Sequence, residues 1–198
     1  MRKVNRLPKP KSLRDNARRW TQELLSEILR KRSFSRVSNK FLERYKKKDI
    51  RRALEKMYSG LCCYCEENTG VVEFGHIEHR MPKSLFPQKT YDWDNLHLSC
   101  TYCNTRKGEQ YNKKYPILDA TKDCITDYLT YRAGEAGIWR FPLKERGLTT
   151  INHADLNREK LSHNRFQISR GVIRVIKKIN SSTPTMDSNI QDFCKIQL

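Results

Sequence analysis

The sequence predicts an α+β fold in which a short cysteine-rich region is flanked by helices at both ends of the chain and by one β-hairpin. Three observations predict this class. Two Cys-x-x-Cys pairs enclose residues 66–99. Apolar residues recur at helical spacing on both sides of them, and a glycine-rich turn joins two short β-prone segments. The 198 residues suffice for one domain with its own core.

The chain is strongly basic, with a formal net charge of +18 from 40 Lys/Arg and 22 Asp/Glu. Residues 1–60 hold 20 of these cations against 6 acids, which is +14 of the excess. A field of that sign attracts polyanions, so nucleic acid is an expected partner. An acidic protein partner, or a basic surface with no specific ligand, is the alternative.

No apolar run approaches the length of about 18 residues that a transmembrane helix needs. The basic N-terminus is followed by no apolar segment, so it does not read as a secretory signal. We therefore expect a cytoplasmic protein without a membrane partner. Seven cysteines in a reducing compartment favour metal binding or isolated thiols over disulfides.

The first 60 residues are expected to form a basic helical extension. Pro8 and Pro10 oppose a helix, and Ser12 is the expected N-cap of the first one, which runs to about Arg30. Its apolar stripe consists of Leu13, Ala17, Trp20, Leu24 and Ile28. A second helical region is expected from about Lys40, with Asp49 as a cap and Gly60 as its end.

Residues 111–198 are expected to hold a β-hairpin and a helical region that pack with the core as one domain. The hairpin spans residues 125–143 around the turn at 133–137. Asn157 is the expected cap of a long final helix. One face of that helix carries Leu161, Arg165, Ile168, Val172, Ile176 and Ile179. A flexible connector is expected at residues 181–189, followed by a docking tail or a frayed end.

Four cysteines at residues 61–110 have the spacing of zinc ligands. Cys62 with Cys65, and Cys100 with Cys103, form two knuckles whose thiolates can close a tetrahedron around Zn²⁺. Cys63 competes with Cys62 as a ligand, and Cys62 is preferred because Cys-x-Cys makes a poorer knuckle. A redox pair is the alternative. A closed four-thiolate site has no open position, so this zinc is expected to be structural.

Three motifs lie between and just after the knuckles, at residues 78–84, 94–96 and 103–108. Their order and spacing resemble those of the HNH nuclease family over residues 62–108. The resemblance implies a ββα-metal core of treble-clef-like form. It also implies hydrolysis of phosphodiester bonds by a divalent metal and a general base.

The resemblance assigns a role to each matching residue. His79 stands at the general-base position, and Glu78 and Asn104 stand at the ligand positions of a catalytic metal. Carboxylate and amide oxygens are hard ligands, which favours Mg²⁺ or Mn²⁺. Asn95 matches the residue that braces the loop holding the histidine. Cations near the motifs are candidate phosphate contacts: Arg80, Lys83, Arg106 and Lys107.

Two departures concern the metal ligands. Many members of the family have Asp or His where this chain has Glu78, and His is frequent where it has Asn104. The longer carboxylate changes the ligand geometry, and the amide implies a weaker, harder site. His76 matches no role that the pattern requires, and a packing or supporting role is favoured over a ligand role.

Short segments elsewhere, at residues 1–6, 91–96 and 155–157, resemble the HNH subunits of Septu anti-phage systems, and similar subunits accompany some retrons. This resemblance implies an ABC-type ATPase partner that restrains the nuclease until infection, with DNA or tRNA as the target. The competing hypothesis is a non-catalytic, zinc-stabilised nucleic-acid-binding or adaptor module. The cysteines and the charge fit both hypotheses, whereas the constellation of Glu78, His79, Asn95 and Asn104 fits only the nuclease.

Overall fold

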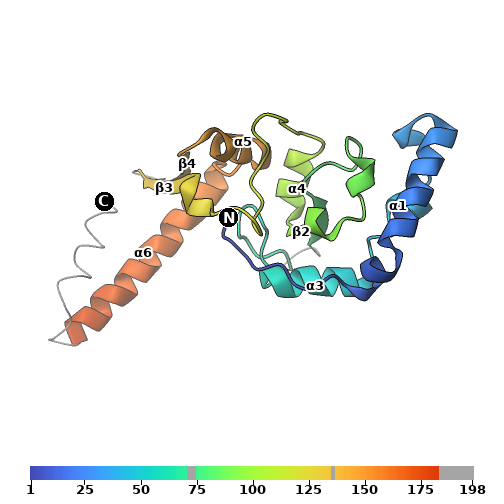
Figure 1. Cartoon of the computed structure of the whole chain (residues 1–198). Helices are drawn as coiled ribbons and strands as arrows, with labels where there is room; N and C mark the ends of the chain where they lie inside the picture. Colours follow the sequence, from blue (N-terminus) through green and yellow to red (C-terminus); the bar gives the residue numbers. More distant parts are fainter. Residues whose placement is uncertain (71–74, 135–136, 183–198) are drawn as a thin grey trace.

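In the computed structural model (Figure 1), which describes residues 1–70, 75–134 and 137–182, helices surround two separate two-stranded antiparallel sheets. The predicted α+β class is confirmed. Buried apolar side chains from both ends of the chain and from the cysteine region belong to one cluster, which includes Leu13, Leu98 and Leu156. The part of the chain that the structure describes contains no helix long and apolar enough to cross a membrane.

Helix α1 (Lys11–Lys31) buries Leu13, Trp20 and Leu24, as its apolar stripe predicted. The predicted cap is wrong, because Pro10 occupies the N-cap position and Ser12 lies inside the helix. The amide of Ser12 instead donates to Oδ2 of Asp49 at 2.8 Å. Asp49 therefore satisfies an open amide of the neighbouring helix, where its charge also suits the positive end of the helix dipole.

The second helical region is divided into α2 (Asn39–Leu42) and α3 (Lys48–Tyr58). The N-cap of α3 is Lys47, so the predicted capping role of Asp49 in its own helix is also wrong. The end of α3 is as predicted. Ser59 and Gly60 have φ angles of 53° and 70°, and the Gly60 amide donates to the carbonyl of Glu55 at 2.9 Å.

A ββα unit occupies the middle of the chain. Strands β1 (His76–His79) and β2 (Leu96–Ser99) pair in antiparallel register, with His79 opposite Leu96. Helix α4 (Thr101–Lys107) follows β2 directly. Figure 1 shows β2 and α4 at the centre of the molecule, above α3. The sheet packs against α3 on one side, so its chemistry-bearing residues have a rigid support.

The predicted hairpin is confirmed as β3 (Leu129–Ala133) and β4 (Ile138–Pro142), with the turn residues 135–136 outside the described residues. Helix α5 (Glu145–Ala154) follows and was not predicted. Its Gly147 is needed for close packing, because an added Cβ would lie 2.1 Å from the carbonyl oxygen of Tyr128.

The long last helix is α6 (Glu159–Ser182). Asn157 is not its cap: the Asn157 side chain accepts from the backbone N–H of Arg140 at 2.7 Å and donates to its C=O at 2.9 Å. This residue therefore joins the start of α6 to the hairpin. The predicted tail lies in residues 183–198, outside the described residues, as does most of the predicted connector at 181–189.

Candidate metal centre and active-site cavity

The four predicted zinc ligands come together in space. The Sγ atoms of Cys62, Cys65, Cys100 and Cys103 all lie within 4.8 Å of one another, and those of Cys65 and Cys100 are 3.7 Å apart. A tetrahedron with Zn–S bonds of about 2.3 Å has sulfur–sulfur edges of about 3.8 Å. The donor set and its dimensions therefore fit a zinc ion.

Each knuckle is closed by an amide that points at the first sulfur of its pair. The amide of Tyr64 donates to Sγ of Cys62, and the amide of Cys103 donates to Sγ of Cys100, both at 3.4 Å. These donors stabilise thiolate charge. Cys63 lies outside the cluster, where its backbone amide donates to the carbonyl of Leu98 on β2 at 2.8 Å. The Sγ atom of Cys62, and not that of Cys63, thus belongs to the group of four sulfurs that could hold a metal ion.

His79 is buried at the end of β1, where it is 7% exposed. Its Nε2 atom lies 2.9 Å from the carbonyl oxygen of Thr90. A carbonyl can only accept, so the neutral ring carries its proton on Nε2 and Nδ1 holds the free lone pair. The ring of Tyr45 meets the imidazole edge-on, with centroids 4.6 Å apart. Burial lowers the pKa of His79 to about 3, so the ring is neutral at physiological pH.

The loop between β1 and β2 is held by Asn95, which is 3% exposed. Its Oδ1 atom accepts from the amide of Met81 at 2.8 Å, and its Nδ2 atom donates to the carbonyls of Met81 at 2.9 Å and Lys89 at 3.1 Å. These contacts join the residues just after His79 to the segment that supplies Thr90. They are the contacts expected of the bracing role that the sequence assigned to Asn95.

Glu78 alternates with His79 along β1 and is 4% exposed. Its Oε1 atom receives Nζ of Lys107 at 2.6 Å and the hydroxyl of Tyr64 at 3.3 Å. The same Nζ atom donates to the carbonyl oxygen of His79 at 2.9 Å. Burial raises the pKa of Glu78, and the Lys107 ammonium and the Tyr64 hydroxyl oppose that rise. Helix α4 thus supplies the cation that pairs with the buried carboxylate.

Three of the four residues in the predicted constellation share one cavity of about 480 Å³. His76, Glu78, His79, Lys83 and Asn104 all line it. Glu78 comes from β1 and Asn104 from α4, so a carboxylate and an amide reach the cavity from two elements. These hard oxygen donors fit Mg²⁺ or Mn²⁺. Asn95 does not line the cavity, which agrees with a supporting place behind it.

The four candidate phosphate contacts fall into two groups. Lys83 lines the cavity, with Nζ 3.3 Å from the hydroxyl of Tyr45, and Arg106 is exposed on α4. Lys107 is 1% exposed and is held by Glu78 and His79, so a phosphate cannot reach it. Arg80 turns away, pairing with Asp119 at 3.4 Å and donating to the Ile117 carbonyl. The predicted phosphate contacts of Arg80 and Lys107 are therefore corrected to internal ion pairs.

Other cavity residues were missed by the sequence analysis. Tyr45, Lys46 and Arg51 also line it, and they belong to α3 and the segment before it. The side chain of Arg51 donates to the carbonyl of Gly75, just before β1. No local pattern marks these residues, because they lie far from the motifs in sequence. Only the density of cations in residues 1–60 hinted at them.

The ββα unit thus brings together a four-cysteine cluster, a buried histidine and hard oxygen donors. Residues 62–110 match the family model described as HNH endonuclease. The predicted resemblance of this region to the HNH endonuclease family is therefore confirmed over residues 62–110.

The chain is also similar to two curated proteins named Septu protein PtuB. The relative from Bacillus thuringiensis is 30% identical over 149 residues, which cover 71% of this chain and 54% of the relative. The relative from Bacillus mycoides (strain KBAB4) is 25% identical over 177 residues, which cover 74% of this chain and 59% of the relative. The chain thus spans somewhat more than half the length of the curated relatives it matches.

Proposed function

We propose that this chain is a metal-dependent endonuclease that hydrolyses phosphodiester bonds in nucleic acid, with DNA favoured and tRNA or other RNA as the alternative target. The observation that carries this proposal is the state of His79. Its ring is buried, neutral and held by the Thr90 carbonyl through Nε2, beside Glu78 and Asn104 in one cavity. A binding module would need no such constellation.

His79 acts as the general base. Nδ1 takes the proton of the attacking water, because Nε2 is committed to Thr90 at 2.9 Å. Tyr45 packs edge-on against the ring and fixes its plane. Asn95 holds the loop that places both His79 and Thr90. The base therefore reaches the substrate already oriented, which avoids an ordering cost in the transition state.

Glu78 and Asn104 would hold the catalytic Mg²⁺ or Mn²⁺. Bound there, the ion supplies charge stabilisation to the scissile phosphate and to the leaving 3′ oxygen. Among the described residues, Lys107 and Tyr64 both contact Oε1 of Glu78, so Oε2 is the carboxylate oxygen that would remain for a cation. Lys83 and Arg106, on the cavity and on α4, position the phosphate backbone by charge. The products would carry a 5′-phosphate and a 3′-hydroxyl.

The cysteine cluster would bind Zn²⁺ as a structural ion. Four thiolates leave no open coordination position, so this ion takes no part in hydrolysis. The ion would hold the start of α4, because Cys100 is the N-cap of α4 and Cys103 lies within that helix. Zinc therefore fixes the helix that carries Asn104 and Lys107.

The similarity to two proteins named Septu protein PtuB supports a role as nuclease effector of an anti-phage complex. We propose an ABC-type ATPase as the partner that restrains the nuclease. A retron complex is a second setting that we propose for this pair. The basic first 60 residues would attract the nucleic-acid backbone with little reading of the bases.

Cleavage assays test the proposal. Plasmid DNA and a tRNA pool are incubated with wild type, His79→Ala and the matched surface control His163→Ala, with Mg²⁺ or Mn²⁺ and with or without a co-expressed ABC-type ATPase. We expect cleavage by wild type and His163→Ala alone, abolished by EDTA and restored by the metal. No cleavage under any condition, with a full zinc content, would favour the non-catalytic adaptor.

A further inference from the structure

Helix α6 leaves the body of the molecule after its first turns. Leu161 and Ser162 are buried against the rest of the chain. The 24 residues of Glu159–Ser182 correspond to about 36 Å of helix. Figure 1 shows the second half of α6 running away from the other helices, toward the lower left.

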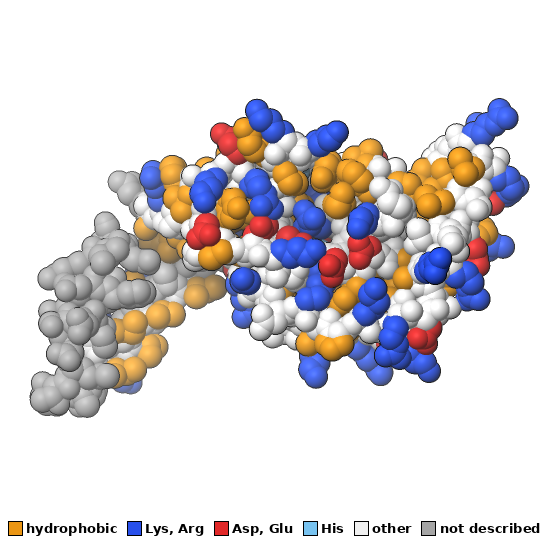
Figure 2. Space-filling model, in the orientation of Figure 1, with side chains coloured by type: hydrophobic (Ala, Val, Ile, Leu, Met, Phe, Trp, Pro, Cys, Tyr) orange, Lys and Arg blue, Asp and Glu red, His pale blue; other side chains and the backbone are white. Residues whose placement is uncertain are grey.

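The exposed part of α6 carries an apolar stripe. Ile168, Val172, Val175 and Ile179 are 67%, 52%, 59% and 51% exposed. Figure 2 shows hydrophobic side chains in a row along this helix. Their steps of four, three and four residues are the a and d spacing of helices that pack against another helix. A stripe of this kind normally faces a core, so its exposure marks a surface that a partner covers.

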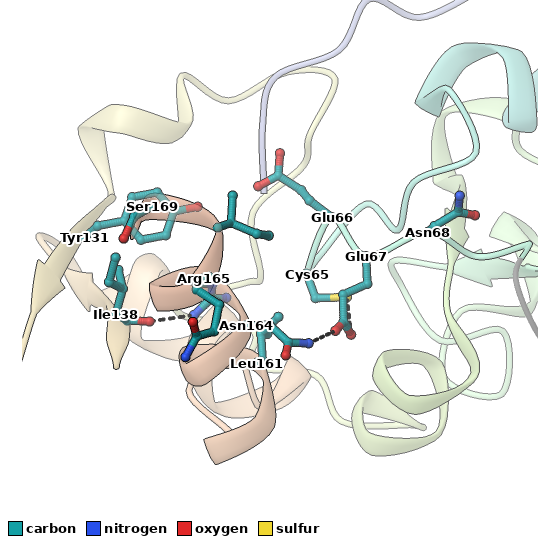
Figure 3. Close-up of a pocket in the computed structure, with 12 residues that line it drawn as sticks. Cys65, Glu66, Glu67, Asn68, Tyr131, Ile138, Leu161, Asn164, Arg165 and Ser169 are labelled. Carbon is teal, nitrogen blue, oxygen red and sulfur yellow. Dashed lines mark hydrogen bonds between the residues drawn. The ribbon is translucent and has the colours of Figure 1, made fainter. Parts of the chain in front are cut away.

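The stripe runs into a concave corner. A cavity of about 670 Å³ lies between the start of α6, the hairpin and the loop after the first cysteine pair (Figure 3), and Ile168 lines it together with Tyr131, Ile138 and Leu161. Two of the polar groups around it are engaged: Asn164 donates to Glu67 at 3.2 Å and Nη1 of Arg165 to the carbonyl of Ile138 at 3.4 Å, whereas Nη2 of Arg165 has no hydrogen-bond partner among the described residues. The apolar part of the lining suits a large apolar side chain.

The charge of α6 indicates which kind of partner can cover its apolar stripe. Beyond Glu159, every charged residue of α6 is a cation: Lys160, Arg165, Arg170, Arg174, Lys177 and Lys178. A second copy would bring two such helices within the screening length of about 8 Å at physiological salt, where they repel. A flat membrane surface fits a basic amphipathic helix but cannot enter the corner at Ile168. An acidic helix meets both requirements.

We propose that α6 is the docking site for a partner protein that presents an apolar helix flanked by Asp and Glu, with one large apolar side chain filling the cavity beside Ile168. The partner helix lies along Val172, Val175 and Ile179. The binding energy comes from the apolar stripe, and the acids provide steering and selectivity. This docking does not depend on the proposed cleavage activity.

Designed peptides test the proposal on the full chain. The probe is a helical peptide with Leu at the a and d positions and Glu at the flanking ones. One control peptide has Lys in place of Glu, and another keeps Glu but has Ser in place of Leu. We expect the Leu/Glu peptide to bind at least about tenfold more tightly than either control by fluorescence anisotropy. Equal binding of the Glu/Ser peptide would overturn the proposal, since charge alone would then explain it.

Substitutions on the chain complete the test. Val172→Asp and Val175→Asp lie on exposed positions, so the fold should persist, and we expect each to weaken the Leu/Glu peptide by about tenfold or more. Leu29→Asp, at a 78% exposed position on α1, is the matched control and should bind as wild type. Three results would overturn the proposal: no binding by the full chain, dimerisation that Val172→Asp abolishes, or recruitment to anionic vesicles that Val172→Asp abolishes.

Discussion

The ammonium of Lys107 lies 2.6 Å from the carboxylate of Glu78, and both side chains are almost fully buried. The sequence assigned them to different partners, a phosphate and a metal ion. In the fold, burial raises the pKa of Glu78, and the Lys107 ammonium opposes that rise while it also donates to the carbonyl of the neighbouring His79. The ion pair therefore holds the carboxylate in one position at the end of β1.

Replacement of Lys107 by Met should destabilise the fold strongly. The change leaves a buried carboxylate without its partner, which costs about 3 kcal/mol of unfolding free energy or more. The double variant Lys107→Met with Glu78→Gln should recover most of that loss, because the uncompensated charge is gone. Urea unfolding of the zinc-loaded proteins measures both. A double variant no more stable than Lys107→Met would show that the ion pair is not the cause.

Acid should destabilise the protein through two buried histidines. Burial lowers the pKa of His79 and of His97 to about 3. The folded state then binds fewer protons than the unfolded chain between pH about 6.5 and 3, so stability is complete above pH 6.5 and is lost as the pH falls. At pH 5 each histidine should cost about 2 kcal/mol relative to pH 7.5.

The variant His97→Gln checks this pH dependence. His97 lies 2.6 Å from the hydroxyl of Tyr58, away from the active-site cavity. The slope of unfolding free energy against pH reports how many more protons the unfolded chain binds than the folded one. Between pH 5 and 6.5 we expect this number to be smaller by about one in the variant. An unchanged slope would assign the acid sensitivity to other groups, such as the cysteine thiolates.

Loss of the zinc cluster should unfold the core. Cys100→Ser removes one thiolate of the four and weakens the closure that positions α4, so we expect less zinc per chain and a lower melting temperature. Cys63→Ala and the exposed Cys124→Ser are matched controls, since neither sulfur belongs to the cluster. Mass spectrometry under native conditions and thermal melting give the two readouts. Full zinc content in Cys100→Ser would contradict the assignment.

Asn95→Ala should impair both stability and cleavage. Three hydrogen bonds to backbone groups of Met81 and Lys89 are lost, each worth about 1 kcal/mol. Asn95→Asp keeps the acceptor for the Met81 amide but lacks the donors. We expect both variants to lower kcat more than they raise KM, because the position of His79 is disturbed rather than substrate binding. A change confined to KM would argue against a positioning role.

Nucleic-acid affinity should separate the two groups of cations. In a His79→Ala background, Lys83→Gln and Arg106→Gln should each weaken binding and reduce the salt dependence of the affinity by roughly one counterion. Arg80→Gln should leave the salt dependence unchanged and lower stability instead, since Arg80 pairs with buried Asp119. Binding titrations at several salt concentrations measure the slopes, and equal slopes for all variants would remove the phosphate assignments.

Several features followed from the sequence because their determinants are local. The spacing of Cys62, Cys65, Cys100 and Cys103 restricts a metal site to a few geometries, and the structure brings these four sulfur atoms together. The β-hairpin was predicted from its glycine-rich turn and from the apolar and aromatic residues on both sides of that turn. The order of the motifs predicted that Glu78, His79 and Asn104 lie together, and in the structure all three line one cavity within the region that matches the HNH model.

Other features were decided only by tertiary structure, because long-range contacts override local preferences. Ser12 and Asn157 resemble helix caps in sequence, yet the Ser12 amide is capped by Asp49 and the side chain of Asn157 joins the hairpin. In the sequence, Lys107 belongs to the motif at residues 103–108 and was predicted to be a surface cation that contacts phosphate. In the structure, α4 directs its side chain inward to Glu78. The amino-acid sequence determines that residue 107 is a cation. Which group this cation pairs with depends on which face of α4 packs against the core.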